Sequence, residues 1–258
     1  MNISSAEIGA LLGAYFWPFV RIAAMLMAAP LFGARNIVFV VHRLGLALGL
    51  TLIVQPMLSP VPFVDPMSAQ GIGILLEQLL LGVAMGFILQ MVFASLIVAG
   101  HSVALTMGLG FAQFVDPANG LSVPVVSKFY LVIGTLLMFA LNGHLIALKV
   151  LVESFETLPV GKEAVSHGEL FTIVLWAGKL YVGALLIALP CMVTITLINI
   201  GFGVMTRSAP QMNIFAVGFP TTLAAGIVIV MLTLPNLLPR FTDLLMESFD
   251  LMQQIIRS

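Results

Sequence analysis

The chain has 258 residues, of which 60% are hydrophobic and only 8% are charged, and its formal net charge is -1. Soluble domains carry about a quarter charged residues, so this composition, with a mean hydropathy of +1.15, excludes a soluble globular domain. Nucleic acid is excluded as a partner because phosphate binding requires clustered lysine and arginine side chains.

Long apolar stretches predict the helices of this protein. A helix that crosses a membrane needs about 20 apolar residues for a hydrocarbon core about 30 Å thick. Six stretches reach that length, at residues 8–32, 37–64, 72–100, 125–152, 170–200 and 214–238. They are continuous, whereas the strands of a membrane barrel show short segments of alternating polarity. The sequence therefore predicts an all-α integral membrane protein with about six long apolar helices in a single membrane domain.

The region that follows the third stretch is too short to cross a membrane. Residues 106–114 contain Gly108 and Gly110, and glycine weakens a helix. Non-helical backbone at membrane depth occurs only where it is buried in protein or lines a cavity. A re-entrant or pore-lining loop is one interpretation, and a connector lying at the membrane interface is the other.

Seven polar side chains interrupt the apolar stretches: Arg21, Glu77, His101, Asn142, His144, Lys179 and Asn199. Such groups usually face a partner or an aqueous cavity, although Arg21 and Lys179 have stems long enough to reach a membrane interface. None of the charged groups has an opposite charge three or four residues away. Each therefore pairs across helices within the chain or with another subunit. In the motif Asn142-Gly143-His144, the glycine lets another helix approach closely and the polar neighbours can hydrogen-bond across the contact.

No motif indicates catalysis, a metal site or a cofactor. The metalloprotease motif HExxH, the nucleophile motif GxSxG and the phosphate-binding loop are all absent. We therefore expect no catalytic residue and no cofactor. A secondary transporter with a broken third helix and an intramembrane enzyme stay as alternatives to a channel-forming structural protein.

Two segments resemble the FliR family of flagellar biosynthesis proteins and its injectisome counterparts. The first covers residues 108–117 (GLGFAQFVDP) and is followed by Pro124, Phe139, Asn142-Gly143-His144, Ser154-Phe155 and Leu158-Pro159-Val160-Gly161. The second covers residues 207–215 (RSAPQMNIF) and is followed by Gly218-Phe219-Pro220. With the length and the number of apolar stretches, the resemblance extends over nearly the whole chain and favours the flagellar system over the injectisome.

The resemblance implies a function that composition does not show. Members of this family are core subunits of the type III secretion export gate in the bacterial inner membrane, at the flagellar basal body. The implied partners are several copies of P-type and Q-type gate subunits in a spiral hetero-assembly, the B-type and A-type membrane components, membrane lipid and the unfolded flagellar proteins that are exported. In such an assembly the kinked helices do not cross the bilayer in the ordinary way. We therefore expect the polar groups inside the apolar stretches to be paired by other subunits.

The resemblance also assigns roles to parts of the chain. It implies that residues 1–165 correspond to the P component and that residues 166–258 form a C-terminal helical hairpin like the Q component. The channel plug near residues 106–117 would consist of Gly108, Leu109, Gly110, Phe111, Phe114, Asp116 and Pro117. The two glycines allow backbone geometry that is forbidden to other residues, and the leucine and phenylalanines supply apolar bulk. Contacts with neighbouring subunits are expected at Asn142, His144, Arg207, Pro210, Gln211, Asn213 and Phe215.

Overall fold

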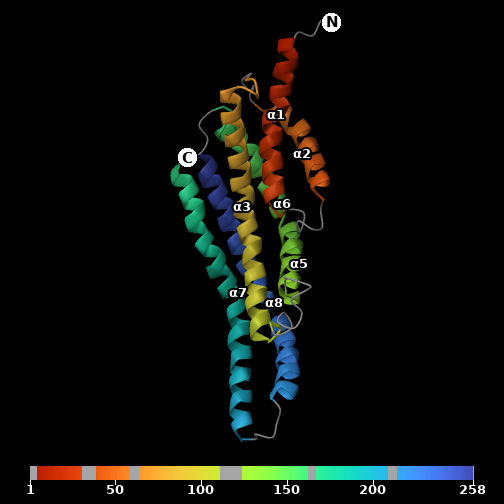
Figure 1. Ribbon diagram of the computed structural model, residues 1–258, viewed down its shortest axis with the longest axis vertical. Coiled ribbons are helices and arrows are strands. Elements are labelled where there is room, and N and C mark those ends of the chain that lie inside the picture. The colour runs from red at the N-terminus through yellow and green to blue at the C-terminus, as the bar shows by residue number, and fades with distance from the viewer. Residues whose placement is uncertain are drawn as a thin grey trace. The chain divides into compact units, whose positions relative to one another are not determined.

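The computed structural model describes residues 5–30, 39–58, 64–110, 124–161, 167–208 and 214–257 (Figure 1). Every element in these ranges is helical, which confirms the all-α class. The elements are α1 (Ser5–Ala28), α2 (Val40–Val54), the short 3-10 helix η1 (Gln55–Met57), α3 (Ala69–Thr106), α5 (Val125–Ala140), α6 (Gly143–Thr157), α7 (His167–Ser208) and α8 (Ile214–Arg257).

Three helices are much longer than the predicted apolar stretches. Helices α3, α7 and α8 contain 38, 42 and 44 residues, which correspond to about 57, 63 and 66 Å at 1.5 Å per residue. The boundary predicted at residue 238 is wrong, because α8 continues to Arg257. Its later turns are amphipathic, with Leu245, Phe249, Met252 and Ile256 buried at helical spacing, and a search for continuous apolar runs does not detect such turns.

The fourth predicted helix, over residues 125–152, consists of two helices. Helix α5 ends at Ala140 and α6 begins at Gly143. Between them Asn142 has φ 56°, in the left-handed region, which asparagine enters more readily than most residues with a side chain. The prediction of one continuous helix is wrong here. Hydropathy carries no information on backbone dihedral angles, so it cannot detect a break caused by the positive φ of one residue.

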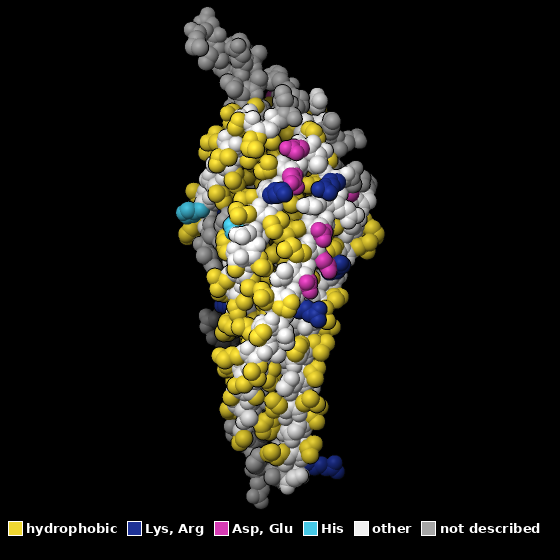
Figure 2. Space-filling view, turned by 180° about the vertical axis from the view of Figure 1, so that it is seen from behind, with side chains coloured by type: hydrophobic (Ala, Val, Ile, Leu, Met, Phe, Trp, Pro, Cys, Tyr) yellow, Lys and Arg dark blue, Asp and Glu magenta, His cyan; other side chains and the backbone are white. Residues whose placement is uncertain are grey.

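Four described helical segments are long and apolar enough to cross a membrane: Val40–Met57, Ala69–Thr106, Gly168–Ser208 and Val217–Arg257. Helices α5 and α6 together can form a fifth, broken span, so the predicted number of six is approximate. Hydrophobic side chains cover much of the visible surface, and most of the charged ones gather in one region, with a Lys or Arg side chain apart from them at the lower end (Figure 2).

The chain divides into two compact units. The first unit comprises residues 1–91, 138–177 and 245–258. In it, Gly82 and Gly86 of α3 face Ala24 and Ala28 of α1, because a Cβ atom at either glycine would lie within 2.7 Å of the corresponding alanine Cβ. This is the small-xxx-small contact by which apolar helices approach closely. Helix α2 also packs on α1 (Figure 1).

The second unit comprises residues 92–137 and 178–244. Phe93 of α3 meets Phe241 of α8 edge to face, with ring centroids 5.8 Å apart. The Ser127 hydroxyl of α5 donates a 3.0 Å hydrogen bond to the carbonyl of Ile97 in α3. These units are defined by contacts within the chain. The predicted division at residue 165 is of another kind, because it concerns likeness to the P and Q subunits, and it stays a prediction.

Candidate functional site

Helix α3 ends at the start of the predicted plug. The N–H of Leu109 bonds to the carbonyl of Ala104, and that of Gly108 to the carbonyl of Leu105, each at 3.0 Å. Gly108 has φ 84°. These two bonds with a left-handed residue form a Schellman motif, which commonly ends helices at glycine.

The end of α3 is held by both long helices of the second unit. Met107 is buried and packs on Gly226 of α8, where a Cβ atom would come within 2.6 Å of the Met107 methyl carbon. The Asn199 amide of α7 donates a 3.3 Å hydrogen bond to the carbonyl of Thr106, one of the carbonyls that a helix end leaves free. The segment after residue 108 therefore leaves the helix from a fixed point.

The structure describes only the first part of the predicted plug. Gly108 adopts the left-handed backbone that its residue type predicts. Gly110 does not use the freedom that its residue type allows, because it is helical and has no positive φ. Its missing side chain provides space for Leu105, since a Cβ atom there would lie 2.8 Å from that side chain. Leu109 is half-buried. Phe111, Phe114, Asp116 and Pro117 lie outside the described residues.

Gly108→Ala is expected to destabilise the end of α3 by about 1–2 kcal/mol, because an L side chain is strained in left-handed backbone. Gly108→Asn should be milder, since asparagine tolerates this region. A suitable control is Gly203→Ala in α7, where a Cβ atom would meet nothing within 4 Å. Thermal unfolding of the purified protein checks whether the melting temperature falls more for Gly108→Ala than for Gly108→Asn. Equal melting temperatures for Gly108→Ala and the control would contradict the assigned role.

Two predicted interface residues flank the break between α5 and α6. Asn142 is exposed and forms the left-handed turn. The His144 ring lies 4.8 Å from that of Phe139, and its Nδ1 has no hydrogen-bond partner among the described residues. Gly143 does let another helix approach, since a Cβ atom there would come within 3.1 Å of Leu245 in α8. The contacts of Asn142 and His144 with other subunits stay a prediction.

The remaining predicted interface residues lie around the α7–α8 connection. Arg207 is exposed in the last turn of α7, where a cation complements the helix dipole. Pro210, Gln211 and Asn213 lie outside the described residues, and Phe215 belongs to the first turn of α8. Their role as subunit contacts also stays a prediction.

A buried arginine organises the first unit. Arg21 of α1 is 0% exposed. Its Nε donates to Gln78 Oε1 at 2.7 Å, and its Nη1 donates to the carbonyl and hydroxyl of Ser154 at 2.8 and 3.1 Å. Nη2 donates to the carbonyl of Leu158 at 2.9 Å, and the guanidinium carbon lies 4.3 Å from the centre of the Phe155 ring. Arg21 thus joins α1 to α3 and to the C-terminal end of α6.

Burial disfavours the charged guanidinium of Arg21, and three features of the cluster offset part of that cost. The carboxylate of Glu77 in α3 stabilises the guanidinium through a coulombic interaction. The carbonyls at the end of α6 carry the negative end of its dipole, and the ring face of Phe155 attracts a cation. The cost of burying this charge is therefore partly compensated within the chain.

The expectation that other subunits pair Arg21 is wrong, and so is the interpretation that its side chain reaches a membrane interface. Its partners lie on two other helices of the same chain. The spacing of charged residues in the sequence did not reveal these partners, because they are neutral groups 57–137 residues away along the chain, and two of the four acceptors are backbone carbonyls. Lys179, by contrast, is exposed.

A second arginine holds α2 against the end of α1. Arg43 is 5% exposed, and its Nη1 donates to the carbonyls of Leu26, Met27 and Ala29 at 3.3–3.5 Å. These carbonyls belong to the last turn of α1 and the residue after it, where a cation is favoured. Among the described residues no three histidine, cysteine, aspartate or glutamate side chains gather in a way that could hold a metal ion.

Comparison with known proteins matches residues 12–248 to the family described as bacterial export proteins, family 1. The chain is 34% identical over 256 residues to the flagellar biosynthetic protein FliR of Escherichia coli (strain K12), covering 99% of this chain and 97% of that protein. It is 38% identical to FliR of Pectobacterium carotovorum subsp. carotovorum, covering 94% and 92% of the two chains. It is 30% identical to FliR of Aquifex aeolicus (strain VF5), covering 93% and 92%.

Proposed function

The chain belongs to family 1 of the bacterial export proteins, and we propose that it serves the flagellar type III export apparatus as a core gate subunit that helps to form and seal the export channel. The support is similarity to FliR proteins over nearly the full length. The observation that supports the sealing role is the fixed end of α3. The packing of Met107 on Gly226 and the hydrogen bond from the Asn199 amide to the carbonyl of Thr106 hold the start of the plug segment there.

The proposed mechanism is steric and non-catalytic. The segment over residues 108–117 starts at a left-handed glycine and carries Leu109, Phe111 and Phe114. Large apolar side chains in a narrow channel exclude water and ions, because a desolvated ion has no compensating partners there. We assign this sealing role to the three side chains and an anchoring role to the end of α3.

The proposed setting is the bacterial inner membrane at the flagellar basal body. Partners are P-type and Q-type gate subunits, the B-type and A-type membrane components, and the unfolded flagellar proteins in transit. Arg207, Pro210, Gln211, Asn213 and Phe215, with Asn142 and His144, are the proposed contacts with neighbouring subunits. The exposed position of Arg207 at the end of α7 supports a docking role, since its donors are available to a partner's carboxylate or carbonyl groups.

The alternative of a secondary transporter with a broken third helix is not favoured. Helix α3 is continuous from Ala69 to Thr106, and the helix that is broken is the fourth predicted one, at Asn142. A midplane solute site built from a broken third helix therefore has no basis in this chain.

Deleting residues 109–114 while keeping Gly108 tests the sealing role. The Schellman motif needs only its glycine and the next N–H, so the helix end should persist while the apolar bulk is lost. Resting cells that carry this deletion are expected to leak small ions and solutes, measured as membrane conductance and as uptake of an otherwise excluded solute.

The control is Gly108→Ala, which perturbs the helix end but keeps the three apolar side chains. It should leak less than the deletion. Unchanged conductance in the deletion strain, with the protein present in the membrane at the wild-type level, would rule out a sealing role for this segment.

A further inference from the structure

Prolines lie inside both helices of the α7–α8 hairpin. Pro190 stands near the middle of α7, and Pro235 lies in α8. A proline inside a helix has no N–H for the carbonyl four residues earlier, and its ring pushes that carbonyl away. The carbonyls of Leu186 and Met231 therefore have no helical N–H to accept from. Because bending at these points breaks no helical hydrogen bond, each helix bends there more easily than at an ordinary residue.

The two bending points lie at the same level of the hairpin. Cys191, which follows Pro190, has its Sγ 3.0 Å from Oγ1 of Thr233, two residues before Pro235. This hydrogen bond ties α7 to α8 beside the prolines. Helix α7 changes direction near its middle (Figure 1). Because both helices can bend at one level, the part of the hairpin beyond it, residues 191–234, can swing as one piece.

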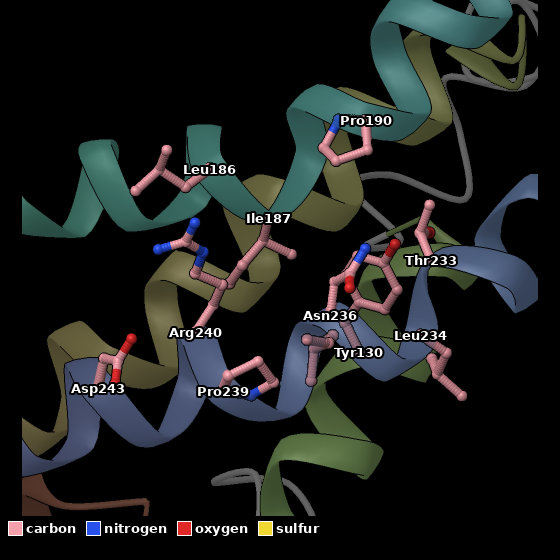
Figure 3. Close-up of a pocket in the computed structure, with 11 residues that line it drawn as sticks. Tyr130, Leu186, Ile187, Pro190, Thr233, Leu234, Asn236, Pro239, Arg240 and Asp243 are labelled. Carbon is pink, nitrogen blue, oxygen red and sulfur yellow. The ribbon is translucent and has the colours of Figure 1, made fainter.

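Free space borders the bending level. A pocket of about 410 Å³ lies within the second unit between α5, α7 and α8, and its lining includes Pro190, Thr233 and Pro239 (Figure 3). A close-packed interior resists a change of helix direction, because side chains would overlap. The pocket lowers that resistance on one side, so the side chains of the two helices have room to repack when the hairpin swings.

The contacts that hold the start of the plug segment lie beyond the bending level. The Asn199 amide of α7 donates to the carbonyl of Thr106, and Gly226 of α8 leaves the space that Met107 fills. Asn199 comes after the proline of α7, and Gly226 comes before the bending point of α8. Both groups therefore belong to the part of the hairpin that swings.

Helix α3, by contrast, is held in place. It is continuous over 38 residues and contains no proline. A Cβ atom at Gly100 would overlap the backbone of Ser127, so α3 lies directly against α5 with no space between them. A swing of residues 191–234 must therefore separate Asn199 and Gly226 from the end of α3.

We propose that Pro190 and Pro235 form a hinge that controls the seal. When residues 191–234 swing, Asn199 and Gly226 leave the end of α3 and the plug segment is released. The proposal rests on the proposed function, because it concerns the opening of the same seal. A chain in the channel favours the released state, since it occupies the space of the plug. The return of the hairpin restores both contacts and closes the channel.

A reversible disulfide tests the movement. A Cβ atom at Gly226 would lie 2.7 Å from Met107 Cγ, so the pair Met107→Cys and Gly226→Cys brings two thiols close enough to be joined. In cells that carry this double variant, oxidation should stop the export of flagellar proteins, and a reducing agent should restore it. Membrane conductance should not rise on oxidation, because the plug stays in place. Wild-type cells treated with the same oxidant are the control and should continue to export.

Stiffening the hinge is the second test. Pro190→Ala combined with Pro235→Ala supplies the missing N–H at both points, so bending must break two hydrogen bonds and export should fall about tenfold or more. The matched control is Pro220→Ala, since this proline of α8 is exposed and α7 contains no second proline that could form a hinge with it. The control should export as the wild type does.

Either of two results would overturn the hinge: export that continues while the cysteine pair is fully oxidised, or normal export by the double proline variant. If the proline variant does not accumulate in the membrane, the disulfide decides, because the same protein is compared before and after oxidation. Leakage in the strain that lacks residues 109–114, without an effect of the disulfide, would remove the hinge and leave the sealing role. A deletion strain that does not leak would remove both.

Discussion

Arg21→Met is expected to destabilise the protein by about 3–5 kcal/mol, the usual effect of removing one member of a buried charged cluster. Methionine has a comparable length and fills much of the same space, but it donates no hydrogen bond. The carbonyls of Ser154 and Leu158 and the Gln78 amide oxygen would each lose the guanidinium as a donor. For a chain of this size the melting temperature should fall by about 6–20 °C, measured by thermal unfolding in detergent.

Arg257→Met is the control for this substitution. Arg257 stands in the last turn of α8 and is exposed, so the same loss of charge and donors should change stability by no more than about 0.5 kcal/mol. Arg21→Lys should lie between the two, because one ammonium group cannot reproduce the fork that reaches two helices. A melting temperature for Arg21→Met equal to that of the control would mean that the cluster contributes nothing to stability.

Gly82→Leu is expected to separate α1 from α3 and to destabilise the first unit by about 3 kcal/mol or more, the upper part of the range for overpacked sites. Even a Cβ atom at this position would overlap the carbonyl oxygen of Arg21 and come within 2.7 Å of Ala24 Cβ. Backbone atoms cannot rotate away as a side chain can, so α1 as a whole must move. That movement would also pull the Arg21 guanidinium away from α6.

A glycine-to-leucine substitution elsewhere on α3, at Gly73, is the control. A Cβ atom at Gly73 of α3 would meet nothing within 4 Å, and leucine has the better helix propensity, by roughly 1 kcal/mol. Gly73→Leu should therefore leave the melting temperature unchanged or raise it, whereas Gly82→Leu should lower it. A shift of the same sign and size in both variants would show that helix propensity, and not the close contact, determines the effect.

The helical class followed from continuous apolar stretches, but the ends and the break of the helices did not. Hydropathy identifies residues that prefer to leave water, and the C-terminal turns of α8 are only half apolar. The end of the apolar stretch at residue 238 is therefore not the end of the helix, which continues to Arg257. The break at Asn142 depends on one dihedral angle, and an asparagine in an apolar stretch is equally compatible with an ordinary helical turn.

The sequence indicated which backbone the plug residues permit but not which distant groups contact one another, and the plug role itself stays a prediction. The left-handed Gly108 agrees with the freedom of glycine to enter that region. The Arg21 cluster was missed because every residue has a carbonyl, so no sequence pattern marks those of Ser154 and Leu158 as acceptors. The Met107 contact depends on the missing side chain of Gly226, more than 100 residues away along the chain.

The distances along the chain in the Arg21 cluster also set an order of events during synthesis. Leu158 follows Arg21 by 137 residues, and a ribosome that adds about 5–20 residues per second takes about 7–27 s to reach it. Throughout that interval the α1 segment carries a positive charge whose acceptors on α6 do not yet exist. Such a charge is tolerated only near water or lipid headgroups. We therefore expect helix α1 to stay at the membrane surface until α6 has been made, and to reach its final place only then.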